Sequence, residues 1–188
     1  MLSPIIKNIV NDVDLDRLQE LVVEANSHPA LGFEVTTRWD GQFRSETRAG
    51  PIRLGNGETI QRDHHVIMAD EPEEILGSDQ AANPQELLFA ALNACMTVGY
   101  VAGASQRGIR LTKLEIETRG TLDLRGFFHL SDMVPPGYPS LEYVVRIAGD
   151  GTPEQFAEIH AEVQATSPNY DNLARAIRME ARLEVEQD

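Results

Sequence analysis

The longest apolar segment of the chain, NPQELLFAALNACMTVGYVAGASQ over residues 83–106, constrains the fold more than any other. Four residues mark its ends: a capping asparagine, a proline at the first helical position, a capping-box glutamate and a glycine after the end, at Asn83, Pro84, Glu86 and Gly108. No charged side chain occurs between Leu87 and Gly103. We therefore expect a long helix that is apolar nearly all round and buried on every side.

The length of this helix also bears on the assembly. A helix of this length measures about 35 Å. The whole chain has 188 residues, which suits one domain or two, and a single domain of that size would struggle to bury such a helix alone. The sequence therefore predicts a homodimer with this helix near its centre.

Composition and charge exclude several classes of protein. The chain is 41% hydrophobic and 24% charged, as expected of an ordinary soluble globular protein. Its formal charge of −14 argues against a nucleic-acid partner and against binding to an anionic membrane surface. The N-terminus does not resemble a secretory signal, and no stretch is expected to approach the ~20 apolar residues of a membrane span, so the predicted location is cytoplasmic. One cysteine, with no pattern of metal ligands, predicts no disulfide, metal or cofactor.

Hydrophobic periodicity gives the remaining elements. Helices are expected over 15–26, 153–164 and a short stretch after Ser167-Pro168. Strands are expected over 33–39 and 42–48, joined by an Asp40-Gly41 turn, and then over 60–68, 111–124, 141–147 and 179–186. A loop with three prolines covers 127–140. This order predicts an α+β fold rather than a doubly wound sheet.

The stretch DEPEEILGSDQAANPQELLFAALNACMTVGYVAGASQRGIRLTKLEIETRGTLDL resembles the core of the OsmC/Ohr family, in which an acidic loop and an Ala-rich helix with a reactive cysteine precede an R-G-I/L-x-L strand. The resemblance extends over about residues 33–185. It implies an OsmC-like domain over 32–188, preceded by an N-terminal helical extension over 1–31. It also implies an intertwined homodimer in which antiparallel sheets wrap around the long central helices, with active sites at the subunit interface.

The resemblance further implies that Cys95 is a peroxidatic thiolate, which reduces organic hydroperoxides or hydrogen peroxide in oxidative stress defence. A free thiol has a pKa of about 8.5 and burial raises it, so a thiolate needs support. Cys95 lies well beyond the first helical turn, and a nearby cation must supply that support. Hairpin arginines are the candidates, and among Arg38, Arg44 and Arg48 we favour the first and the last.

Two residues depart from the family pattern. Gln85 stands ten residues before Cys95, where the family has a glutamate. Glu86 is a poor substitute, because it lies about 180° round the helix from Cys95 whereas Gln85 lies about 80° away. Ser167 stands where a second cysteine would close a disulfide, and its expected role is to cap the following helix. An external thiol reductant would then be the required partner.

Two functions remain open on the sequence. The first is a one-cysteine peroxidase with Cys95, Arg38 or Arg48, and Gln85 at its site. The second is a non-catalytic protein that binds an apolar or electrophilic small molecule at the dimer interface. Histidines add little: His64 and His65 are expected to point to opposite faces of a strand, and His160 has too few companions for a metal site.

Overall fold

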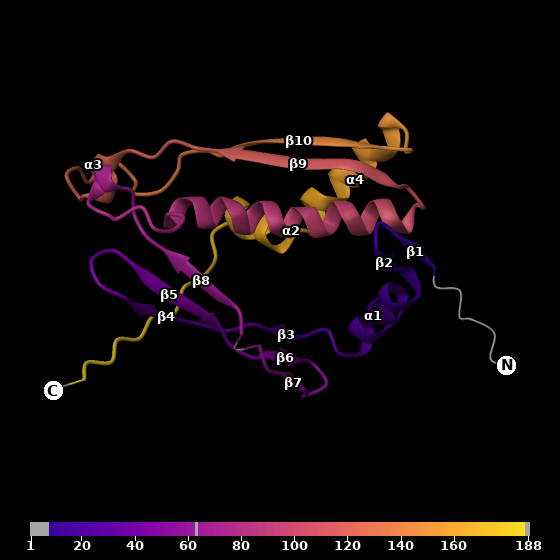
Figure 1. The fold of residues 1–188 in the computed structure, drawn as a ribbon, viewed down its shortest axis with the longest axis horizontal. Helices are drawn as coiled ribbons and strands as arrows, with labels where there is room; N and C mark the ends of the chain where they lie inside the picture. Colours follow the sequence, from indigo (N-terminus) through magenta and orange to yellow (C-terminus); the bar gives the residue numbers. More distant parts are fainter. Residues whose placement is uncertain (1–7, 63, 187–188) are drawn as a thin grey trace.

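The computed structural model describes residues 8–62 and 64–186, which form an α+β fold built around one long helix (Figure 1). That helix, α2 (Pro84–Gln106), begins with the predicted capping box: the Asn83 side chain accepts from the Glu86 N–H, and the Glu86 carboxylate accepts from the Asn83 N–H. The sequence prediction of the central helix is confirmed.

One layer of the molecule covers one face of α2. It contains the antiparallel hairpin of β9 (Leu111–Arg119) and β10 (Glu142–Gly149), with α3 (Leu124–Phe127) in the connection, followed by α4 (Pro153–Thr166) and α5 (Pro168–Ala174). Their buried side chains form the core, which consists of Leu92, Met96, Tyr100, Ala104, Ile109, Ile159 and Val163. Gly99 and Gly103 allow α4 to approach closely, because a Cβ atom at Gly103 would lie 3.2 Å from Cγ2 of Ile159.

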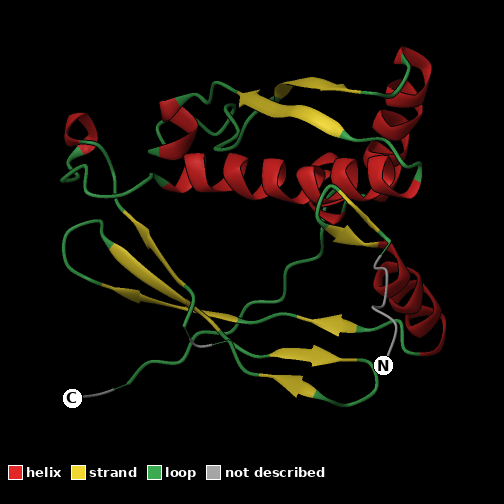
Figure 2. Ribbon diagram, turned by 45° about the vertical axis from the view of Figure 1, so that its right-hand side comes forward, coloured by secondary structure: helices red, strands yellow, loops and turns green. Residues whose placement is uncertain are grey.

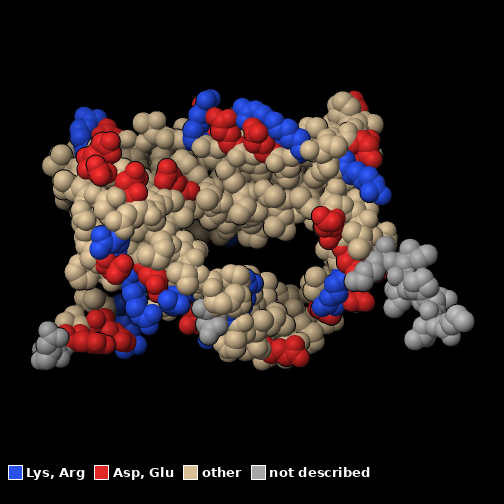
Figure 3. All heavy atoms as spheres, viewed as in Figure 1, with Lys and Arg blue, Asp and Glu red and all other residues tan. Residues whose placement is uncertain are grey.

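The second layer consists of small antiparallel sheets from the N-terminal half (Figure 2). One sheet joins β4 (Val35–Trp39), β5 (Ser45–Ala49) and β8 (Val66–Ala69), and another joins β3 (Leu31–Gly32), β6 (Ile52–Leu54) and β7 (Thr59–Ile60). A 3-10 turn, η1 (Glu73–Ile75), follows β8. The space-filling view shows that the molecule is hollowed between this layer and the α2 layer (Figure 3).

The N-terminal segment attaches at the far end of α2. β1 (Ile9–Val10) and β2 (Val13–Asp14) form a short hairpin that leads into α1 (Leu15–Ser27), which confirms the predicted helix. Asn11 fixes the hairpin, since its side chain donates to Ser105 Oγ and to the Ile109 carbonyl. None of the side chains of α1 is buried. The division of the chain at residues 31 and 32 stays a prediction.

The prediction that α2 is buried on every side is wrong for a single chain. Val98 is 70% exposed, because the elements that contact α2 lie on its other face. The expectation of no segment resembling a membrane span is also wrong. α2 itself is long and apolar enough, with a mean hydropathy of 1.6 over an 18-residue window. Core helices of soluble proteins pass the same test.

Three strand predictions need correction. The strand expected over 111–124 ends at Arg119, where its pairing with β10 ends, and Leu124 begins α3. The strand expected over 60–68 is interrupted: β7 ends at Ile60, β8 begins at Val66, and residue 63 lies outside the described residues. His64 and His65 therefore precede β8, and their rings lie 4.0 Å apart instead of on opposite faces of a strand. The cause is β8 pairing with β5 only from Val66 onward.

The closing strand expected over 179–186 is absent, since residues 175–186 contain no strand. The segment still has the alternating side chains of a strand, since residues two apart lie on the same side. Arg178 pairs with Glu180 at 2.9 Å, and Arg182 pairs with Glu184 at 2.8 Å. A strand needs a neighbouring backbone for its hydrogen bonds, and one described chain provides none here.

Candidate functional site

Cys95 lies in the middle of α2, partly buried under the start of α5. The Ser167 hydroxyl donates a hydrogen bond to Cys95 Sγ over 3.3 Å, and Ser167 is only 5% exposed. As predicted, Ser167 also caps α5, where its Oγ accepts from the Tyr170 N–H. The residue that replaces the expected second cysteine is therefore in direct contact with the thiol.

A second contact holds α5 against α2 at the same place. The Asn169 side chain donates to the Ala91 carbonyl over 2.8 Å, one helical turn before Cys95. Because Asn169 and Ser167 belong to one short capped segment, the two hydrogen bonds fix the serine hydroxyl on the sulfur. Sequence reasoning missed Asn169, since no motif distinguishes it from other polar residues of a short helix.

Gln85 occupies the first turn of α2, away from Cys95. It lines a cavity of about 500 Å³ between α2, α5 and the proline-rich loop. Most of the lining is apolar or aromatic and includes Leu88, Leu92, Tyr138 and Tyr170. Cys95 is not among the lining residues, which agrees with the angular offset of about 80° between positions 85 and 95. Gln85 and Cys95 therefore do not share one pocket in a single chain.

The candidate arginines lie on the β4–β5 hairpin, in the opposite layer from Cys95 (Figure 1). Arg38 lies directly opposite Glu46 in the register, and Arg48 Nε pairs with Glu46 Oε1 at 2.7 Å. These three residues share one face of the hairpin, because side chains alternate along a strand. Among the described residues, neither arginine forms a hydrogen bond to Cys95. Arg44 instead donates weakly to Ser78 Oγ over 3.5 Å.

The acidic loop before α2 is organised by Asp70, which is 1% exposed. Its carboxylate accepts from the N–H groups of Glu71, Ser78 and Gln80 and from the Ser78 hydroxyl, the last over 2.7 Å. The hydrogen bond from Ser78 is the main reason that the pKa of Asp70 is lowered, and the backbone donors add to it. Burial, followed by the charge of Asp70, raises the pKa of Glu71. Sequence reasoning treated this segment only as a charged loop.

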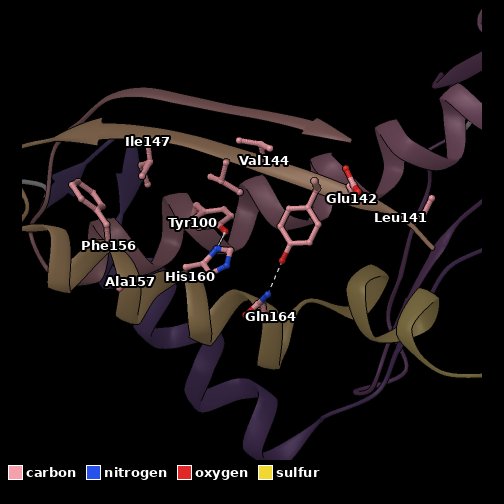
Figure 4. Close-up of a pocket in the computed structure, with 11 residues that line it drawn as sticks. Tyr100, Leu141, Glu142, Val144, Ile147, Phe156, Ala157, His160 and Gln164 are labelled. Atoms are coloured by element: carbon pink, nitrogen blue, oxygen red, sulfur yellow. Dashed lines mark hydrogen bonds between the residues drawn. The ribbon is translucent and has the colours of Figure 1, made fainter. Parts of the chain in front are cut away.

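A separate polar cluster lies between β10 and α4 (Figure 4). The Tyr100 hydroxyl is hydrogen-bonded to His160 Nδ1, and Gln164 Nε2 donates to the Tyr143 hydroxyl over 2.7 Å. Burial, with a smaller contribution from Tyr143, raises the pKa of Tyr100 to about 12. Tyr100 also belongs to the buried core, and His160 is partly buried. Their approach depends on the α2–α4 contact, which is not encoded locally.

No group of three or more His, Cys, Asp or Glu side chains within residues 8–62 and 64–186 has the arrangement of a metal site. In the loop over 127–140, Phe127, Phe128 and Met133 are 61%, 56% and 89% exposed. The arrangement that remains for chemistry is one thiol with a hydroxyl donor, near the uncovered face of α2.

Comparison with known proteins gives one family and a set of similar folds. A family model described as OsmC-like protein matches residues 77–182. An OsmC-like protein from Mycoplasma pneumoniae superposes with a TM-score of 0.59 at 15% identity, over 77% of this chain and 89% of the other. The organic hydroperoxide resistance protein OhrB of Bacillus subtilis gives a TM-score of 0.44 at 19% identity, over 77% and 91% of the two chains. No curated protein matches the sequence.

Proposed function

Because the chain belongs to the OsmC-like protein family, we propose that it is a thiol-dependent peroxidase with Cys95 as its nucleophile. Its substrates are organic hydroperoxides or hydrogen peroxide, and its role is oxidative stress defence. The observation that carries the proposal is the hydrogen bond from Ser167 to Cys95 Sγ. A hydroxyl donor stabilises a thiolate relative to a thiol, because it can donate to the anion.

The reaction balances with one cysteine and two external thiols. The Cys95 thiolate attacks the terminal peroxide oxygen and the O–O bond breaks. The leaving alkoxide takes a proton and departs as an alcohol, or as water from hydrogen peroxide, and Cys95 becomes a sulfenic acid. One external thiol converts this acid to a mixed disulfide with loss of water. A second external thiol then releases Cys95 and leaves the reductant as a disulfide.

In this proposal the activating cation comes from a second copy of the chain. The uncovered face of α2, with Val98 70% exposed, is an apolar surface that a soluble protein normally buries. In an intertwined homodimer the β4–β5 hairpin of one copy covers α2 of the other. Glu46 then holds the arginine in place, and Arg38 or Arg48 reaches the thiolate of the partner subunit. Gln85 keeps a hydrogen-bonding role but contributes no charge.

Steady-state turnover tests the proposed activity. The reduced protein is mixed with cumene hydroperoxide and excess dithiothreitol, and peroxide loss is measured. Wild type is expected to consume many equivalents, and Cys95→Ser is expected to fall to the uncatalysed rate. Arg38→Gln and Arg48→Gln are compared in parallel. Loss of turnover in only one of them identifies the activating arginine, whereas full activity in the pair combined excludes both.

A second function, binding without catalysis, is favoured by the cavity that Gln85 lines, since this apolar space of about 500 Å³ does not include the thiol. The rate of alkylation distinguishes the two functions. If the protein is a peroxidase, iodoacetamide is expected to modify Cys95 at pH 7 faster than it modifies free cysteine. If the protein only binds a ligand, the modification of Cys95 is expected to be slower than that of free cysteine. Under either function we propose a cytoplasmic location, because a reduced thiol needs a reducing compartment.

A further inference from the structure

A groove that Cys95 does not line lies between β10 and α4 (Figure 4). Tyr100, at its base, follows Cys95 by five residues, which places the two side chains about 140° apart round the helix. The groove encloses about 680 Å³. This volume lies within the range of small-molecule sites in proteins. The proposed peroxidase reaction uses none of its side chains.

His160 presents a donor to this groove. The proton of the buried Tyr100 hydroxyl needs a hydrogen-bond acceptor, and the hydroxyl is hydrogen-bonded to His160 Nδ1. In the neutral imidazole Nδ1 then accepts, and the ring proton lies on Nε2. Among the described residues, no hydrogen bond occupies Nε2. The rings of Tyr100 and Tyr143, with centroids 6.1 and 6.2 Å away, hold the imidazole between them.

Tyr143 presents a second donor. Its oxygen accepts from Gln164 Nε2 over 2.7 Å, which leaves the phenol proton available. Because Tyr143 and His160 line the same groove from facing elements, their free protons can converge on one acceptor atom. Two donors that face the same groove match a carbonyl or carboxyl oxygen.

The other end of the groove is apolar. Ile147 from β10 faces Phe156 and Ala157 from α4, as the close-up shows (Figure 4). An apolar wall with a small number of placed polar groups is the usual composition of a ligand site. His160 lies in the middle of the groove, and Leu141 and Glu142 lie at the end opposite to Phe156. The position of the donors beside the aliphatic and aromatic side chains sets the orientation of a bound molecule.

We propose that this groove binds a small amphipathic carbonyl compound, an apolar chain or ring that carries one carbonyl or carboxyl oxygen. The oxygen accepts from His160 Nε2 and the Tyr143 hydroxyl, and the apolar part lies along Ile147, Phe156 and Ala157. The site is separate from the thiol, so it does not depend on the proposed peroxidase activity.

Calorimetric titration of the full chain tests the site. The protein carries Cys95→Ser, which removes any reaction at the thiol from the measurement. The probes are 4-phenylbutanamide, with an uncharged head group, and 4-phenylbutanoate, with an anionic one. We expect saturable binding of at least one probe, one molecule per chain, with a Kd below about 1 mM. The absence of saturable binding by both probes would overturn the proposal.

Three variants locate the binding. Ala157→Phe fills the apolar end and is expected to abolish binding, whereas Ala165→Phe, on an exposed side of α4 that does not line the groove, is expected to leave the Kd within about twofold. Tyr143→Phe removes one donor and is expected to weaken binding about fivefold. Circular dichroism checks that each variant is folded. Unchanged affinity in folded Ala157→Phe would show that the probe binds elsewhere, for example in the cavity lined by Gln85, and would contradict the proposal.

Discussion

At the scale of single residues, the contact between Cys95 and Ser167 shows what the sequence can and cannot provide. The cap at Ser167 was predictable, since Ser-Pro before a helical pattern is a local signal. The 3.3 Å contact with the sulfur depends on how α5 docks on α2, and only the family resemblance indicated it. The arginine positions could not be placed, because the hairpin that carries them lies in the other layer.

The same contact predicts that a second cysteine can be introduced. In Ser167→Cys the new sulfur would lie beside Cys95 Sγ, so peroxide treatment is expected to form a disulfide and remove two hydrogens from the intact mass. Thr166→Cys is the matched control, since Thr166 points its hydroxyl to the Glu162 carbonyl instead. Two free thiols in oxidised Ser167→Cys would show that the serine does not contact Cys95 in solution.

The environment of the Asp70 carboxylate leads us to expect that the stability of the protein depends on pH. Its folded-state pKa is lowered, chiefly by the Ser78 hydroxyl, so its contribution is present above the unfolded pKa of about 3.9 and is lost as the pH falls through the folded value. Asp70→Asn is therefore expected to lower the Tm by several degrees at pH 7, with a gap to wild type that narrows below about pH 4. The exposed Asp79→Asn in the same loop is expected to change little. Thermal melts across pH would refute the role of Asp70 if both variants behaved alike.

At the scale of elements, local signals were reliable where a segment is long or capped. The capping boxes at Asn83 and Thr152 fix the starts of α2 and α4, and both helices were predictable. Strand ends were less predictable because pairing decides them: β8 begins only where β5 offers a partner. Residues 175–186 alternate like a strand yet remain unpaired, since alternation does not supply a neighbour.

The close approach of α2 and α4 predicts the effect of overpacking. A Cβ at Gly103 would already lie 3.2 Å from Ile159, so Gly103→Leu is expected to lower the free energy of unfolding by about 1–3 kcal/mol. Gln106→Leu, exposed three residues later on the same helix, controls for the added side chain and is expected to change it by less than about 0.5 kcal/mol. Equal stability of the two variants in urea denaturation would contradict close α2–α4 packing.

At the scale of the whole molecule, the hollow between the two layers and the exposed face of α2 are the features that one chain leaves incomplete. The sequence predicted a helix in need of more cover than 188 residues provide, and the structure locates the uncovered face at Val98. The antiparallel α+β fold of the family is confirmed. The homodimer stays a proposal, supported by this face and by the unpaired segment 175–186.

Sedimentation equilibrium checks that proposal. Wild type is expected at twice the mass of the chain. Val98→Glu, which places a charge on the uncovered face of α2, is expected to shift the protein to a monomer. Ala165→Glu adds the same charge on the exposed side of α4 and is expected to stay dimeric. A wild-type monomer at micromolar concentration would rule out the intertwined assembly.

The central claim is that Cys95 is a peroxidatic thiol, and a single-turnover measurement tests it most directly. The reduced protein is mixed with one equivalent of cumene hydroperoxide and its intact mass is followed over seconds to hours, with Cys95→Ser in parallel. The account predicts a rapid gain of one oxygen atom in wild type, reversed by a dithiol, and no gain in the variant. A wild-type Cys95 that stays reduced for hours under excess peroxide would contradict the claim.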